Sequence, residues 1–253
     1  MYLSRIRHIA NFHGPHLLRG HFNSGRCPVC RKRTLFVEHD DWLRDFYFCL
    51  RCDSIPRQRA LMMVLDREFP HWTEGELHES SPAGASSLAL QRRCAGYSQS
   101  HYWPEVTPGT LHQGVRCENL EALTFADNSL DFFITQDVFE HILRPQRAFA
   151  EIARVLKPGG AHVFTVPLYH QHAETVVRAE PEGDGIRHLL EPDYHGNPID
   201  PNGSLVIREW SDDIVDFIAR HGGLETHIHN TSDRSVGLDG EFLDVLVSRK
   251  QGD

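Results

Sequence analysis

The sequence has no long apolar run, and it lacks the features of an export signal. No stretch approaches the ~20 apolar residues that a membrane helix needs. Residues 1–15 contain neither an apolar segment of ~7–15 residues nor a small-residue cleavage site. We therefore expect a soluble, cytoplasmic protein without a membrane partner. Its 253 residues suffice for one large domain and one small module.

Glycine is scarce at a place where it would be informative. Residues 76–84 read ELHESSPAG, which has the outline of a strand, a tight turn and the start of a helix. In open α/β enzymes this turn often carries three glycines, which let the backbone approach a ligand closely. Only Gly84 is present here. The turn is therefore a cofactor loop built from other small residues, a vestige of one, or an ordinary turn.

Basic residues are in the minority, and they are unevenly distributed. The net charge is −9, but residues 1–60 carry +6 and residues 61–253 carry −15. The acidic body argues against a broad surface for nucleic acid. The basic N-terminal part could bind an anionic partner, or the asymmetry could serve solubility alone.

Cysteine is also scarce, but four of the six cysteines form two pairs. Cys27 and Cys30 lie in CPVC, Cys49 and Cys52 lie in CLRC, and 18 residues separate the pairs. This spacing is typical of zinc sites. Four thiolates complete a tetrahedron without an open position, so we expect structural Zn²⁺ in a zinc ribbon. The alternatives are four unrelated thiols or two disulfides, and disulfides are disfavoured in a cytosolic chain.

A helix is expected directly after the second cysteine pair, beginning near Pro56. Arg57 and Arg59 lie in its first turn, where the helix dipole does not favour cations. This placement is consistent with contacts to the other domain or to a ligand, and equally with a solvated face.

The remainder of the chain alternates between expected strands and helices. Strands are expected within residues 76–80, 96–103, 114–119, 130–138, 161–167, 224–230 and 241–250, and helices within 85–95, 144–157 and 211–223. This order predicts a mostly parallel sheet with helices on both faces. A ligand would then bind beyond the carboxyl ends of the strands.

The predicted organisation has two parts and one insertion. Residues 1–60 form the zinc-ribbon module with its flanking segment, and residues 61–253 form the α/β domain. Residues 168–210 interrupt the alternation and are rich in His, Pro, Gly and Asp. Because so long a connection in a compact domain is usually functional or disordered, we predict that it is an ordered cap over the substrate site.

Three segments together resemble the class I S-adenosylmethionine-dependent methyltransferases. They are LTFADNSLD at residues 123–131, EH at Glu140–His141 and RVLKPGG at residues 154–160, in the order and spacing of that family. The resemblance covers roughly residues 75–250 and implies a Rossmann-like, doubly wound sheet of seven strands. A zinc ribbon before such a domain, and the segment YHGNPIDPNGSLVIREW at residues 194–210, also resemble a group of bacterial methyltransferases of poorly defined substrate.

The resemblance implies a set of residues that bind S-adenosylmethionine. His78 takes the place of the family's acid, and Glu79 could supply the carboxylate if the turn shifts by one residue. The candidates for the methionine end of the cofactor are Glu79, Ser80, Ser81 and Gly84 in the loop, together with Gln136 and Asp137 after a later strand. The candidates for the ribose are His101, Tyr102 or Glu105, and those for the adenine are Asn119 and Leu120.

A base is needed if the acceptor is an O- or N-nucleophile. His141 matches the histidine of the family's EH pair, although it could instead be a structural helix residue. His195, in DYHGNP, is the preferred catalytic base, since a neutral histidine suits pH 7, and Tyr194 and Asn197 would shape its pocket. The further candidates are His170, His172 and Asp193.

The predicted function is methyl transfer to a small-molecule, saccharide or peptide acceptor. One alternative is an RNA methyltransferase whose basic ribbon grips the phosphate backbone. The other is a non-catalytic adaptor in which the degenerate loop no longer binds cofactor. Salt-dependent RNA affinity and failure to bind cofactor would support these alternatives, respectively.

Overall fold

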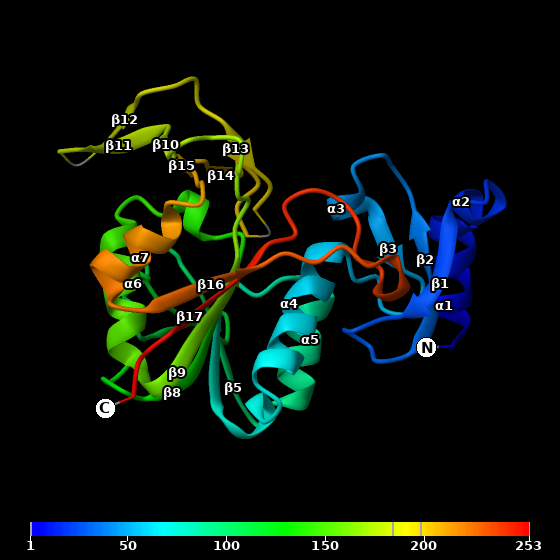
Figure 1. Cartoon of the computed structure of the whole chain (residues 1–253), viewed down its shortest axis with the longest axis horizontal. Helices are drawn as coiled ribbons and strands as arrows, with labels where there is room; N and C mark the ends of the chain where they lie inside the picture. Colours follow the sequence, from blue (N-terminus) through cyan, green and yellow to red (C-terminus); the bar gives the residue numbers. More distant parts are fainter. Residues whose placement is uncertain (1, 184, 198, 253) are drawn as a thin grey trace.

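The computed structural model describes residues 2–183, 185–197 and 199–252. A small N-terminal module lies beside a larger α/β domain, and a set of short hairpins lies above that domain (Figure 1). Among the described residues, no helix has the length and apolar character needed to cross a membrane.

The large domain is built on one mixed sheet of eight strands in the order β16-β17-β9-β8-β4-β5-β7-β6. The strands are β4 (Glu76–Ser80), β5 (Gly96–His101), β6 (Leu111–His112), β7 (Val115–Cys117), β8 (Leu130–Gln136), β9 (Leu156–Thr165), β16 (Glu225–His229) and β17 (Val245–Arg249). The strands from β7 to β9 pair in parallel, whereas β17, β16 and β6 pair antiparallel. All seven expected strands are confirmed, and the two-residue β6 adds an eighth.

Helices cover both faces of the sheet because its strands are apolar on both faces. The helices are α4 (Pro56–Glu68), α5 (Gly84–Arg93), α6 (Pro145–Val155) and α7 (Ile214–Gly222), with short 3₁₀ turns η2 (Trp72–Glu74) and η3 (Phe139–His141). Successive side chains of a strand point to opposite faces. Ile134 accordingly packs in the core beneath α4 and α5, and Phe133 packs in the core beneath α6 and α7.

The N-terminal module contains a three-stranded antiparallel sheet and four short helical segments. They are β1 (Phe22–Arg26), β2 (Arg33–Glu38), β3 (Tyr47–Cys49), α1 (Tyr2–His8), η1 (Ile9–His13), α2 (Gly14–Leu18) and α3 (Leu43–Phe46). Phe36 and Tyr47 of the module share one apolar core with Leu61 and Leu65 of α4. The module therefore packs on the large domain through a continuous core, and the predicted boundary at residue 60 lies inside α4.

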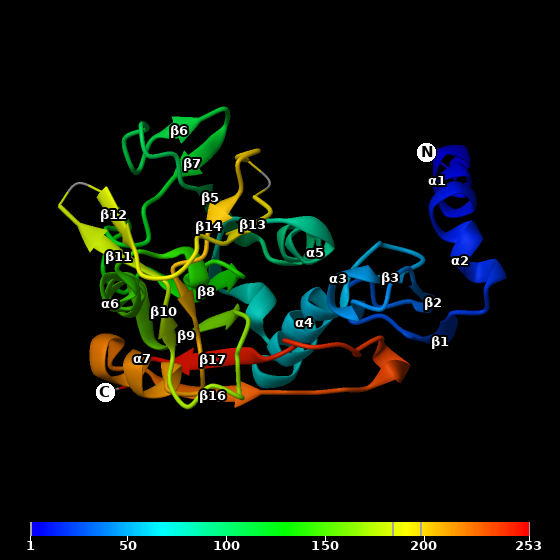
Figure 2. The ribbon, with the colours of Figure 1, turned by 90° about the horizontal axis from the view of Figure 1, so that it is seen from above.

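The connection between β16 and β17 also holds the module (Figures 1 and 2). It contains the 3₁₀ turn η4 (Arg234–Val236) and approaches β1 so closely that a Cβ on Gly25 would lie 2.0 Å from the Ser235 carbonyl oxygen. Buried Arg59 donates through Nη2 to the carbonyl oxygens of Gly237 and Tyr47, both at 2.7 Å. Of the two readings that the sequence left open for Arg59, a contact or a solvated face, the structure shows the contact.

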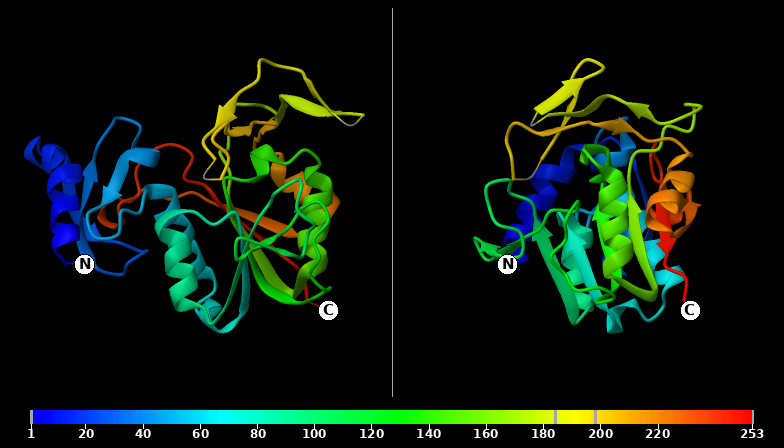
Figure 3. Two further views of the ribbon diagram at one scale, coloured as in Figure 1. Left: turned by 180° about the vertical axis from the view of Figure 1, so that it is seen from behind. Right: turned by 90° about the vertical axis from the view of Figure 1, so that its left-hand side faces the viewer.

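Residues 168–210 form three two-stranded pairings rather than a continuation of the large sheet. The strands are β10 (Val176–Val177), β11 (Ala179–Glu182), β12 (Gly185–His188), β13 (Tyr194–His195), β14 (Ser204–Leu205) and β15 (Arg208–Glu209), paired as β10–β15, β11–β12 and β13–β14. This segment lies above one end of the sheet (Figure 3). Buried Trp210 anchors its end by donating from Nε1 to the Phe139 carbonyl oxygen at 3.1 Å.

Candidate active site

A cleft of about 1270 Å³ lies beyond the carboxyl ends of β4, β5, β8 and β9. Three parts of the molecule form its walls. The N-terminal part contributes Trp42, Arg44, Asp45 and Arg57, the strand ends contribute residues that include Ser81, His101 and Gln136, and the hairpins above contribute residues that include His195, Asn197 and Leu205. The cleft lies where the parallel sheet predicts a ligand.

The turn after β4 has the backbone of a tight loop although it carries one glycine. Ser81 has a positive φ of 57°, and its N–H donates to the Ser100 carbonyl oxygen at 2.8 Å. Ser81 and Ala83 line the cleft. Gly84 has a φ of 76° and begins α5, but an added Cβ there would lie 2.1 Å from Nε2 of Gln58. The retained glycine therefore allows α4 and α5 to pack, while the serine faces the cleft.

Glu79 lies behind the cleft wall. Its side chain is fully buried and accepts hydrogen bonds from Ser87, Gln136 and Tyr97 at 2.7, 2.8 and 2.7 Å. Burial raises the pKa of Glu79, although these three hydrogen bonds oppose the rise. Gln136 lines the cleft and also accepts from Ser86 at 2.9 Å. Glu79 therefore fixes Gln136, and a direct contact between Glu79 and a cofactor stays a prediction.

The neighbouring His78 points to the opposite face of the sheet from Glu79. Its two ring nitrogens lie 2.8 and 2.9 Å from the hydroxyls of Ser98 and Ser100, and its ring packs against Phe125 and Phe133. Burial lowers the pKa of His78 to about 3. A neutral histidine thus occupies the position where the family carries an acid.

The other predicted cofactor residues divide into two groups. His101, Tyr102 and Glu105 line the cleft. Ser80, Asn119 and Leu120 are not among the lining residues: Ser80 and Leu120 are buried, and Asn119 Oδ1 accepts from the Glu121 N–H at 2.9 Å. The structure thus gathers eight of the predicted cofactor and catalytic candidates around the cleft, namely Ser81, His101, Tyr102, Glu105, Gln136, Asp137, His141 and His195.

Asp137 is bound by two arginines from the N-terminal side of the cleft. Its Oδ2 lies 2.7 Å from Nη2 of Arg44 and 3.1 Å from Nη1 of Arg57, and its Oδ1 accepts from Thr165 at 2.9 Å. Burial alone would raise the pKa of Asp137, but the charges of Arg44 and Arg57 lower it to about 2. The sequence left Arg57 open between a contact and a solvated face; the structure places it against Asp137, where it helps to fix an ionised carboxylate at the cleft.

Glu140, three residues further on, is a buried carboxyl group that accepts no hydrogen bond from the described residues. It is 2% exposed, and neither carboxyl oxygen has a hydrogen bond from the part of the chain that the structure describes. Burial and the nearby charge of Asp137 raise the pKa of Glu140 to about 8. Strongly perturbed carboxyl groups in clefts are candidates for function. Sequence reasoning passed over Glu140, although the EH pair contained it.

His141 and His195 lie beside Glu140. The Leu205 carbonyl oxygen is 2.9 Å from Nδ1 of His141, which assigns the proton to Nδ1 and leaves the lone pair on Nε2. Nε2 lies 3.8 Å from Oε1 of Glu140, and the His195 ring stands edge-on to the His141 ring at 5.3 Å. Burial lowers the pKa of His141. A neutral imidazole near a carboxyl group can accept a proton.

The four paired cysteines meet in the module. Sγ of Cys27 is 3.7 Å from Sγ of Cys52, and Sγ of Cys30 is 4.0 Å from Sγ of Cys49. A zinc tetrahedron with Zn–S bonds of ~2.3 Å has edges of about 3.8 Å, so the four sulfurs could hold such an ion.

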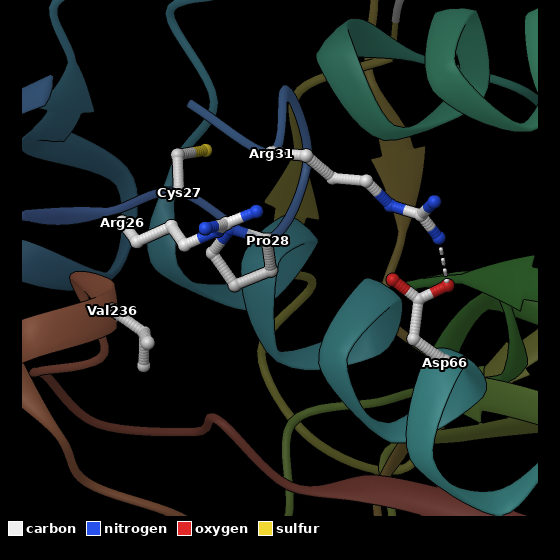
Figure 4. Close-up of a pocket in the computed structure, with 6 residues that line it drawn as sticks. All are labelled: Arg26, Cys27, Pro28, Arg31, Asp66 and Val236. Atoms are coloured by element: carbon white, nitrogen blue, oxygen red, sulfur yellow. Dashed lines mark hydrogen bonds and ion pairs between the residues drawn. The ribbon is translucent and has the colours of Figure 1, made fainter. Parts of the chain in front are cut away.

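A separate hollow of about 370 Å³ lies next to Cys27. There Arg31 forms an ion pair with Asp66 of α4, with an N–O distance of 2.9 Å (Figure 4).

A family comparison identifies the central part of the chain. Residues 82–164 match the family model described as a methyltransferase domain. An uncharacterized methyltransferase of Mycobacterium avium is 42% identical over 76 residues, which cover 26% of this chain and 30% of that protein. One from Mycobacterium tuberculosis is 42% identical over 48 residues, 19% of each chain. The chain thus matches less than a third of the length of these curated relatives.

Solved structures give likenesses of low sequence identity. The S-adenosylmethionine-dependent methyltransferase of Mesorhizobium loti is 15% identical, with a TM-score of 0.49 over 76% of this chain and 98% of that chain. The 1,6-didemethyltoxoflavin-N1-methyltransferase of Burkholderia thailandensis, solved with 1,6-didemethyltoxoflavin and S-adenosylhomocysteine, is 14% identical, with a TM-score of 0.44 over 77% and 78% of the two chains.

Proposed function

The chain belongs to the class I S-adenosylmethionine-dependent methyltransferases through its methyltransferase domain, and from this premise we propose that the cleft binds S-adenosylmethionine and catalyses methyl transfer. The observation that carries the proposal is the position of the cleft. It lies beyond the carboxyl ends of the parallel strands, between the turn after β4 and the Glu140–His141–His195 group.

The residues around the cleft fit this cofactor. Ser81 and the start of α5 offer small side chains and backbone N–H groups to the methionine carboxylate. The Gln136 amide, held by Glu79 and Ser86, offers a fixed polar group beside them. His101 and Tyr102 lie at the end of β5 and suit the ribose hydroxyls. S-adenosylmethionine, when bound, supplies a methyl group activated by a sulfonium.

The residues on the cap side suit proton transfer from the acceptor. We assign the base role to Nε2 of His141, because the Leu205 carbonyl oxygen fixes the ring and leaves this nitrogen unprotonated. His195 reaches the same place from β13, and either histidine could take the acceptor proton. Glu140, once ionised, would stabilise the imidazolium that forms.

The proposed acceptor is a small molecule, a saccharide or a peptide. Aromatic side chains of Trp42, Trp103, Tyr169 and Phe242 line the cleft together with polar groups, as expected for a polar ligand with an apolar face. We also propose that the four cysteines hold one structural zinc ion. The basic N-terminal part supports one alternative, in which the acceptor is RNA. If the protein does not bind the cofactor, the alternative is a non-catalytic adaptor.

Calorimetry with S-adenosylhomocysteine tests the proposal without knowledge of the acceptor. We expect one binding site in the full-length protein, and weaker binding in Gln136→Ala because its amide faces the cleft. Gln91→Ala, on the exposed side of α5, is the matched control and should bind like the wild type. No binding by folded wild-type protein would contradict the enzyme and support the adaptor.

A further inference from the structure

Two histidines and an aspartate meet on the N-terminal module, outside the cleft. Nε2 of His13 lies 3.0 Å from Oδ1 of Asp53, and Nε2 of His8 lies 3.3 Å from Oδ2 of the same carboxylate. One potential ligand atom from each residue lies within 4.8 Å of the other two. Two segments that are distant in sequence therefore direct three metal-binding side chains to one point.

The local backbone explains how His8 and His13 reach the same side. In an α-helix, residues five apart are rotated by about 140° and face different directions. Here Ile9–His13 form a π-helical turn, η1, and the Gly14 N–H donates to the Ile9 carbonyl oxygen. Such i→i+5 bonding brings residues five apart closer to one face, and π turns, which are rare, occur frequently at functional sites.

Asp53 is held in place by the second cysteine pair. It follows Cys52 directly, has a φ of 56°, and its N–H donates to the Cys49 carbonyl oxygen at 2.8 Å. Aspartate tolerates this left-handed conformation better than most residues do. The turn that presents two of the cysteines thus also presents the Asp53 carboxylate to the N-terminal helices.

The ring nitrogens are arranged as in a metal site. Nδ1 of His13 lies 3.0 Å from Nε2 of His39, whose ring stacks on His16 at 3.9 Å. A ligating histidine usually donates its second N–H to a carboxylate, a carbonyl or a water, and here Nε2 of His39 can accept in their place. Without an ion, Nε2 of His13 shares a hydrogen bond with Oδ1 of Asp53 at 3.0 Å; with the His13 proton on Nδ1, the Nε2 lone pair would instead bind an ion placed between them. Nε2 of His8 is buried and has no hydrogen bond within the described ranges. A cation between these lone pairs and the carboxylate would stabilise the arrangement.

We propose that His8, His13 and Asp53 bind a second divalent transition-metal ion, of which Zn²⁺ is the natural first probe. The separations of 3.0 and 3.3 Å agree with the edge of about 3.3 Å in a tetrahedron with bonds of ~2.0–2.1 Å. Three protein ligands leave the fourth position to water. The ion ties the N-terminal helices to the module and is independent of the proposed methyl transfer.

Metal titration of the full-length protein tests this site. Chelation first removes any second ion, and native mass spectrometry then verifies that the protein carries one zinc. Zn²⁺ is titrated into this protein by calorimetry. We expect one further equivalent in the wild type. His8→Ala and Asp53→Asn should weaken that equivalent by at least about tenfold, since each removes one of three ligands. Asparagine tolerates the left-handed backbone as aspartate does, so the second variant keeps the turn. His16→Ala, which stacks on His39 but offers no ligand here, should bind like the wild type.

Co²⁺ identifies the ligands independently. The second equivalent of Co²⁺ should add weak d–d absorption without an increase in thiolate charge transfer. Three results would overturn the proposal: no second equivalent in the wild type, a second equivalent of undiminished affinity in both His8→Ala and Asp53→Asn, or a second equivalent that adds thiolate charge transfer. Circular dichroism of each variant confirms that the module is folded.

Discussion

The two sides of the cleft hold carboxyl groups three residues apart in opposite states. On the side of the N-terminal module, Asp137 pairs with Arg44 and Arg57, and its pKa is lowered to about 2. On the side of the cap, Glu140 has no hydrogen bond from the described residues, and its pKa is raised to about 8. The difference indicates that the first side is a fixed, charge-compensated wall, whereas the second side keeps a proton-exchanging group available.

The largest effect is expected from removing the proposed base on the cap side. His141→Ala should lower kcat by on the order of 10²–10⁴-fold, because the acceptor proton loses its recipient. Transfer from tritium-labelled S-adenosylmethionine to an acceptor found by screening measures this, and S-adenosylhomocysteine affinity should stay unchanged. His227→Ala, on the exposed side of β16, is the control. Wild-type kcat in His141→Ala would show that another group takes the proton.

Removing an arginine that compensates the charge of Asp137 should lower the free energy of unfolding, and not only the activity. Arg44 is 6% exposed, so Arg44→Met leaves the partly buried Asp137 with only Arg57 as its cation. We expect a loss of about 3 kcal/mol in the free energy of unfolding, as for other broken buried pairs. Urea denaturation measures this loss, and exposed Arg67→Met serves as the comparison. If Arg44→Met and Arg67→Met lowered the free energy of unfolding equally, Arg44 would not be needed to compensate the charge of Asp137.

On the cap side, Glu140→Gln should make the free energy of unfolding of the protein less dependent on pH. A carboxyl group with a folded pKa of about 8 and an unfolded pKa of ~4.3 binds more protons in the folded state between these values. The wild type therefore loses stability as pH rises from about 5 to 9. The variant lacks this loss, so its stability relative to the wild type should rise by on the order of 4 kcal/mol between pH 5 and pH 9. Urea denaturation at pH 5 and pH 9 measures the difference, which should be smaller at pH 5. A difference independent of pH would contradict the raised pKa.

The smallest effect is expected from the more exposed arginine. The side chain of Arg57 is 24% exposed, and Arg44 remains beside Asp137 when Arg57 is replaced. Arg57→Gln should therefore lower the free energy of unfolding by only about 0.5–1 kcal/mol. The same urea assay, run in parallel with Arg44→Met, compares the two. If Arg57→Gln lowered the free energy of unfolding more than Arg44→Met, Arg57 rather than Arg44 would be the main partner of Asp137.

Local patterns predicted the elements and much of the candidate site. The alternation of apolar segments predicted seven strands of the sheet, and the family resemblance implied that Ser81, His101 and Gln136 would lie at one cofactor site. Periodicity is a local property that survives in the fold, which explains this success. The orientation of Glu79 was not predictable in the same way, because its burial depends on Tyr97 and on α5.

By itself, the sequence determined the α/β order, the paired cysteines and the EH pair, because spacing along the chain specifies them. The tertiary structure alone decided three things. It placed Arg44 and Arg57 of the N-terminal side against Asp137, it left the buried carboxyl group of Glu140 without a hydrogen bond from the described residues, and it brought His195 of the cap to His141. The physical reason is that charge compensation and desolvation depend on which distant segments pack together, and neither can be read from neighbouring residues.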